Sequence, residues 1–223
     1  MDDRTIQTTF EEMLGGFRPS RYVRERSLAL YSAAITLAEE NALTNAARFC
    51  LENGVASEQL YEVVLQSYLF LGFPRMLIAA ERLHLVSPRT DVAECEDPRR
   101  DVDPDDWLER GQELCRRVYD GNYEALKSRV QSMAPEIFLW MELEGYGKVL
   151  SRPGLDIVGR ETAIVACLTV ENRRKQLHSH LKGALNVGAA PELLLDVVAD
   201  LRPIAPEGTV SATDILVQLG VVS

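Results

Sequence analysis

Apolar residues recur at helical spacing along most of this chain. In the segment after Pro19-Ser20, for example, Val23, Leu30, Ala34 and Leu37 fall on one broad stripe, and Asn53-Gly54 and Gly72-Phe73-Pro74 are typical helix-ending signals. The pattern predicts helices over about 20–41, 43–53, 57–72, 74–85, 107–119, 123–133, 135–146, 156–172, 173–187 and 191–201, and a short last helix that starts around 211–213. The expected fold is therefore all-α.

One stretch, residues 87–106, lacks this periodicity. It holds three prolines, eight acidic residues and three basic ones, which is typical of a solvated connector. We expect three parts: a first helical repeat over 1–86, an acidic connector over 87–106 and a second helical repeat over 107–223.

The two helical parts show internal similarity. When residues 26–64 are placed on residues 160–198 without a gap, 10 of 39 positions are identical, among them Arg26 with Arg160 and Gly54 with Gly188. This predicts a tandem duplication. At two positions where the halves differ, Glu161 stands opposite Ser27 and His180 opposite Ala46.

Composition narrows the function classes. Aromatic residues make up only 7% of the 223 residues, which disfavours an all-β fold, and the formal net charge of -10 disfavours nucleic acid as a partner. Half of that excess, a net -5, belongs to the connector. The amino terminus has no leader pattern and no apolar run reaches the roughly 20 residues that span a bilayer, so we expect a cytoplasmic protein without a membrane partner.

The sequence contains no motif that is typical of a metal or cofactor site. The four cysteines, Cys50, Cys95, Cys115 and Cys167, are too widely spaced for a thiol redox pair or a zinc site. Phosphate-binding glycine loops, the G-x-S-x-G elbow and H-E-x-x-H are absent from the sequence. We therefore expect neither a metal nor a cofactor.

Glu161 and His180 are the candidate catalytic residues. Helical spacing places Glu161 among Ile164, Val165 and Leu168, and a carboxylate in an apolar stripe must be paired or poised for proton transfer. Two structural alternatives stay open: Glu161 as an acid in the first turn of its helix, and His180 as a core histidine.

Basic residues gather around His180. Arg173 is the candidate ligand for a substrate carboxylate, although such a cluster can equally be the solvated face of a helix. The cluster comprises Arg173, Arg174, Lys175, His178, His180 and Lys182.

The segment RETAIVACLTVENRRKQLHSHLKGALNVGAAPELLLDVV resembles the core of the carboxymuconolactone decarboxylase and alkylhydroperoxidase D-like superfamily, and residues 52–83 resemble the same family's stretch through its Gly-x-Pro turn. The resemblance implies an antiparallel helical bundle that assembles into a homo-oligomer; we expect a dimer or trimer. It also implies that Glu161 and His180 are the family's acid and histidine. The two positions of the peroxidase branch's C-x-x-C hold Arg173 and Gln176, so the thiol mechanism is disfavoured.

The decarboxylase branch acts on a carboxylated lactone without a cofactor. The resemblance therefore implies a lyase or isomerase with His180 and Glu161 as catalytic residues, Arg173 and Gln176 as substrate-binding residues, and a small anionic substrate. A non-catalytic oligomeric scaffold is the alternative, and a peroxidase is the third possibility.

Overall fold

The computed structural model describes residues 1–88 and 102–222, and within these ranges every regular element is a helix, which confirms the all-α prediction. The elements are α1 (Asp3–Gly16), α2 (Val23–Leu37), α3 (Glu40–Glu52), α4 (Ser57–Val86), α5 (Pro104–Tyr119), η2 (Asp120–Asn122), α6 (Tyr123–Met133), α7 (Pro135–Trp140), the π-helix η3 (Met141–Leu150), α8 (Ile157–Val170), α9 (Arg174–Asn186), α10 (Pro191–Leu201) and α11 (Pro206–Gln218).

Several boundaries differ from the sequence expectation. The first helix, α1, was not expected, and the helix after the connector starts at Pro104 rather than 107, with Asp103 as its N-cap. The last helix starts at Pro206, so Gly208 lies inside it and does not break it. A Cβ on Gly208 would stand 1.8 Å from the carbonyl oxygen of Thr169, so glycine allows α11 to pack directly on α8. Most of the expected connector, residues 89–101, lies outside the described residues.

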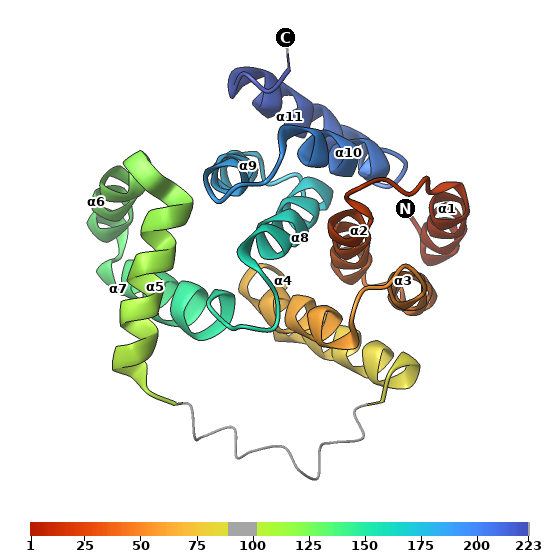
Figure 1. Cartoon of the computed structure of the whole chain (residues 1–223), viewed down its shortest axis with the longest axis horizontal. Helices are drawn as coiled ribbons and strands as arrows, with labels where there is room; N and C mark the ends of the chain where they lie inside the picture. Colours follow the sequence, from red (N-terminus) through yellow and green to blue (C-terminus); the bar gives the residue numbers. More distant parts are fainter. Residues whose placement is uncertain (89–101, 223) are drawn as a thin grey trace.

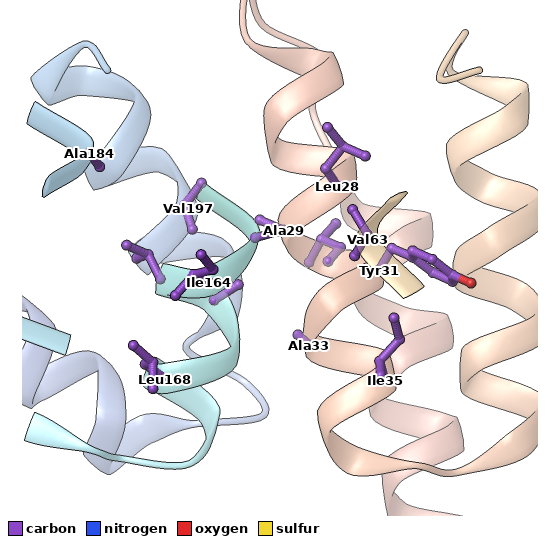
Figure 2. Close-up of a cluster of buried hydrophobic side chains, with 14 of the residues drawn as sticks. Leu28, Ala29, Tyr31, Ala33, Ile35, Val63, Ile164, Leu168, Ala184 and Val197 are labelled. Atoms are coloured by element: carbon purple, nitrogen blue, oxygen red, sulfur yellow. The ribbon is translucent and has the colours of Figure 1, made fainter. Parts of the chain in front are cut away.

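The core is centred on two helices, α2 and α8, which lie side by side in the middle of the molecule (Figure 1). Both are buried around most of their circumference, as helices at the centre of a globular protein are. Figure 2 shows Ala29 between the two helices, while Tyr31 and Ile35 point to the other side of α2. The small side chain of Ala29 thus permits close approach of the two helices.

Helices α1 and α3 cover one side of this pair, α4 lies beneath it, and α10 and α11 cover its upper side (Figure 1). On the remaining side, α5 packs on η3 and α9. Glycines bring α5 and η3 together, because a Cβ on Gly111 would stand 1.8 Å from the carbonyl oxygen of Glu142, and one on Gly147 would stand 1.9 Å from that of Trp107. This close contact fixes the position of the α5 and η3 residues that line the candidate site.

The element boundaries repeat along the chain. Helices α2, α3 and α4 start at residues 23, 40 and 57, and helices α8, α9 and α10 start at 157, 174 and 191, which is a constant offset of 134. The residues with positive φ follow the same offset: Ala38 (58°) with Asn172 (50°), and Gly54 (81°) with Gly188 (101°).

A pair of buried arginines follows this offset as well. Arg26 on α2 forms two 2.8 Å hydrogen bonds to Asp200 on α10, and Arg160 on α8 forms a 2.8 Å ion pair with Glu62 on α4. Helices α2, α3 and α4 correspond to α8, α9 and α10, so each arginine lies on the first helix of one set and binds the third helix of the other set. In addition, Arg26 donates to the carbonyl oxygen of residue 18 and Arg160 to that of residue 152, which lie 134 positions apart. These contacts interlock the two halves.

Helix α4 is the one described helix whose length and composition would allow it to cross a membrane, and it is weak evidence for a span. Gly72 interrupts it with φ 77° and ψ 168°, as the Gly-x-Pro signal predicts, so two shorter helices meet at a kink. Neither part reaches the roughly 20 residues of a bilayer-spanning helix.

Candidate functional site

Glu161 lies in the second turn of α8 and is fully buried. Helix α8 starts at Ile157, after Asp156 caps it by accepting a 2.9 Å hydrogen bond from the Gly159 amide. The first turn contains no acidic residue, so the interpretation of Glu161 as a first-turn acid is wrong. The carboxylate instead sits in the apolar stripe, as its helical spacing predicts.

His180 on α9 is the partner of this carboxylate. Its Nδ1 lies 2.8 Å from Oε2 of Glu161, and only 7% of the residue is exposed. The imidazole also meets the Phe70 ring edge to face, with 5.5 Å between the ring centroids. An ionised carboxylate only accepts hydrogen bonds, so with Glu161 ionised Nδ1 is the donor and Nε2 is the remaining ring nitrogen. We call Glu161 and His180 the dyad.

Gly183 gives α9 its close approach to the dyad. It lies three residues after His180, on nearly the same face of α9. A Cβ there would stand 2.7 Å from the Val118 side chain and 3.4 Å from Oε2 of Glu161. A larger residue would push α9 away from α5, so glycine at this position keeps the histidine within reach of the carboxylate.

The second oxygen of the carboxylate, Oε1, is buried and has no hydrogen-bond partner among the described residues. Glu62, an equally buried acid, is a useful comparison, because Arg160 and Arg152 both donate to its carboxylate at 2.8–3.0 Å. Glu62 is thus a fully paired structural acid. An unpaired buried oxygen costs about 1–3 kcal/mol and needs an explanation, which is often functional.

His180 lines a pocket of about 250 Å³, which we call the dyad pocket. The wall is mostly apolar and aromatic and is contributed by α4, α5, α7, η3 and α9. The lining residues are Leu69, Phe70, Tyr119, Ile137, Trp140, Met141, Glu144, Gly145, Tyr146, Leu150 and His180. A mostly apolar, aromatic lining with a few polar groups is typical of sites that bind small organic molecules.

Two tyrosines stand in this wall. The rings of Tyr119 and Tyr146 meet edge to face with their centroids 6.0 Å apart. Burial raises the pKa of Tyr119 to about 12, and burial together with nearby Tyr119 and Glu161 raises the pKa of Tyr146 well above its usual value. Both hydroxyls therefore keep their protons at neutral pH and can act as hydrogen-bond donors.

The structure does not bring the two expected substrate-binding residues to the dyad. Arg173 is exposed, pairs with Glu171 at 3.1 Å and precedes α9, while Gln176 is exposed on the outer face of that helix. Neither lines the dyad pocket. Both residues lie at the start of α9, where the helical turn directs them to solvent.

Sequence reasoning missed the aromatic wall. Phe70, Tyr119, Trp140 and Tyr146 come from three regions of the chain, and their convergence depends on the α5–η3 contact. Gly111 and Gly147 permit this contact. They would have indicated close packing of helices only if the helix that packs against each glycine had been known.

Within the part of the chain that the structure describes, no cluster of three or more His, Cys, Asp or Glu could hold a metal ion. The three described cysteines are free and buried, and burial is the largest cause that raises the pKa of each thiol. They are Cys50, Cys115 and Cys167, while Cys95 lies outside the described residues. Such thiols are weak nucleophiles.

Comparison of the sequence with protein-family models and with curated proteins finds no match. The candidate function therefore rests on the geometry and on the resemblance in sequence.

Proposed function

We propose that this protein is a cofactor-independent acid–base enzyme, a lyase or isomerase of the carboxymuconolactone decarboxylase-like type, that acts on a small carboxylated substrate in the dyad pocket. The observation that carries the proposal is the one-sided pairing of Glu161. Its Oε2 accepts from Nδ1 of His180, its Oε1 has no partner among the described residues, and His180 lines an apolar pocket.

The dyad fits proton transfer. Glu161 fixes the tautomer and the orientation of the imidazole, so that Nε2 is the atom available to a molecule in the pocket. When Nε2 takes up a proton, the buried carboxylate stabilises the imidazolium at a distance of 2.8 Å. In an isomerisation His180 acts as the base and then as the acid, in a decarboxylation it acts as the acid alone, and in both Glu161 is its positioning residue.

A decarboxylation balances with these groups. The bond between the substrate carbon and its carboxylate breaks, carbon dioxide leaves, and the electron pair moves into the conjugated carbonyl to give an enolate. Protonated Nε2 of His180 then gives its proton to carbon, and solvent restores that proton. The net reaction consumes one proton for each carbon dioxide released. Tyr119 and Tyr146 lie in the same wall and their hydroxyls are hydrogen-bonded to each other, which leaves one hydroxyl proton for an enolate oxygen.

The duplication and the family's helical bundle belong to the same proposal. The constant offset in helix starts, in positive-φ residues and in the two arginine contacts supports a tandem origin of the halves. The first half has Ser27 and Ala46 where the second has the dyad, so we propose a single active half.

We also propose a homo-oligomer. Exposed apolar side chains lie along the second part of α4 and on α7, and a second copy would cover them. They are Phe73, Leu77 and Leu85 on α4, and Ile137, Leu139 and Trp140 on α7. Ile137 and Trp140 also line the dyad pocket, so in the proposed oligomer this pocket lies at the subunit boundary.

The test is turnover by a His180→Ala variant. The probe is a panel of unsaturated lactone carboxylates, followed by NMR for carbon dioxide release and for uptake of solvent deuterium at carbon. We expect the wild-type protein to turn over at least one member and His180→Ala to lose about 100-fold or more of the rate, which is the range for removal of a general acid–base group. The matched control is His84→Ala, an exposed histidine on α4 outside the pocket. Equal rates in the two variants would contradict the proposal.

A further inference from the structure

A second cavity, of about 280 Å³, lies between α5, α6 and α9, and we call it the basic cavity. Its lining includes Arg129 of α6 and His178 and Lys182 of α9, but no acidic residue. Asn122, Ser179 and Asn186 add neutral polar groups. In a chain with 34 acidic and 24 basic residues, a cavity with basic and no acidic side chains is unexpected.

The three basic side chains have no ion-pair partner within the described residues, whereas nine of the sixteen other described arginines have one. His178 and Lys182 are four residues apart and share one face of α9, so both side chains can reach the same anion. Arg129 faces them from another helix and can bind a carboxylate through two parallel hydrogen bonds.

The basic cavity adjoins the dyad pocket, because Tyr119 lines both. The proposed reaction needs a group that holds a carboxylate, and Arg173 lies elsewhere on the surface. The basic cavity offers such groups, and Tyr119 lies between them and the pocket that His180 lines.

We propose that the basic cavity is an anion-binding site for small carboxylates, held by Arg129 and Lys182 with His178 as a further donor. The choice of a carboxylate rather than another anion rests on the proposed function; the site itself rests on the three unpaired basic groups. A volume of about 280 Å³ suits a ligand of a few carbon atoms.

The test is isothermal titration calorimetry of the full chain at low ionic strength with three probes: malonate, succinate and inorganic phosphate. We expect saturable binding of a dicarboxylate that weakens as salt is added. Arg129→Ala and Lys182→Ala should each weaken it by about fivefold or more, as expected for a charge-assisted contact at a partly exposed position.

The matched controls are Lys127→Ala on α6 and Lys175→Ala on α9. Each removes one positive charge from the same helix as a proposed ligand, but neither residue lines the basic cavity. We expect these variants to bind like the wild-type protein. Circular dichroism spectra of all four variants should match, since the substituted residues are not part of the core.

Three results would overturn the inference: no saturable binding, equal weakening in the control variants, or phosphate binding tighter than both dicarboxylates. The result is independent of the proposed function, because binding is measured without turnover. Anion binding without any turnover would leave the site and remove the enzyme proposal, whereas turnover without anion binding would do the reverse.

Discussion

The contact between α5 and η3 allows a sharp test with two glycines of one helix. Gly145 and Gly147 are both in η3 and are two residues apart. A Cβ added to Gly147 would stand 1.9 Å from the Trp107 carbonyl oxygen, while one added to Gly145 would meet nothing within 4 Å. The same chemical change, glycine to alanine, thus probes a closed and an open position.

The expected magnitude follows from these distances. Real Cβ atoms do not approach other atoms closer than 3.0 Å, so in Gly147→Ala the two backbones must separate by at least about 1.1 Å. Overpacking of this kind costs about 1–3 kcal/mol or more, and the higher helix propensity of alanine returns about 1 kcal/mol. The net expectation is that Gly147→Ala lowers the free energy of unfolding by about 1–2 kcal/mol, and that Gly145→Ala leaves it unchanged or raises it by up to about 1 kcal/mol.

The assay is urea denaturation followed by circular dichroism, with both variants and the wild-type protein under the same conditions. Because Tyr146 adjoins Gly147 and lines the dyad pocket, Gly147→Ala should also change the near-ultraviolet tyrosine signal. Equal unfolding free energies for the two variants would refute the packing argument.

Three further predictions concern a buried ion pair, a partly exposed ion pair and the buried thiols. Arg160→Met leaves the buried Glu62 with Arg152 as its only ion-pair partner among the described residues, and should lower the unfolding free energy measured in urea by about 3 kcal/mol. The double variant with Glu62→Leu should recover part of this loss, because a buried apolar pair is tolerated where a buried lone charge is not. The hydrogen bond from Arg75 lowers the pKa of Glu171 below 4.5, so this pair stabilises the fold above that pH and the gain is lost as pH falls through the lowered pKa. Between about pH 5 and 3, the unfolding free energy should therefore fall less steeply in Arg75→Ala than in the wild-type protein. Identical pH dependence of the two proteins in this range would contradict the prediction. The three described cysteines should resist a thiol reagent at pH 8 until denaturant is added, and rapid reaction of more than one thiol of the native chain would be inconsistent with their burial.

Much of the helical layout was predictable because its signals are local. Helix α6 has the predicted bounds and α10 starts at Pro191 as expected, since proline at a helix start and periodic apolar residues act within a few turns. Helix α1 was missed because only Ile6 and Phe10 of its residues are buried, which leaves a weak apolar stripe. The helix predicted over 135–146 ends too early and the last helix was predicted to start too late, because Gly147 and Gly208 lie inside helices and pack against residues far away in the sequence.

The same distinction applies to the candidate site. Glu161 and His180 could be found from the sequence, because a charge in an apolar stripe and an inward histidine are visible on single helices, and the offset of 134 showed that the other half lacks both. The sequence does not give the distance between the two side chains. In the structure, Nδ1 of His180 lies 2.8 Å from Oε2 of Glu161. The aromatic wall and the place of Arg173 depend on packing between helices and on the exact turn at which α9 begins, and no local pattern contains that information.

The central claim is that the dyad is retained for proton transfer and not for stability. The most direct measurement is the pair of turnover and unfolding free energy on one preparation of Glu161→Gln, which keeps the shape of the side chain and removes its charge. If the account holds, turnover falls by about 100-fold or more while the unfolding free energy stays the same or rises, because a buried charge with one unpaired oxygen is lost. A loss of about 3 kcal/mol or more in unfolding free energy, with turnover retained, would identify the dyad as a structural ion pair and contradict the account.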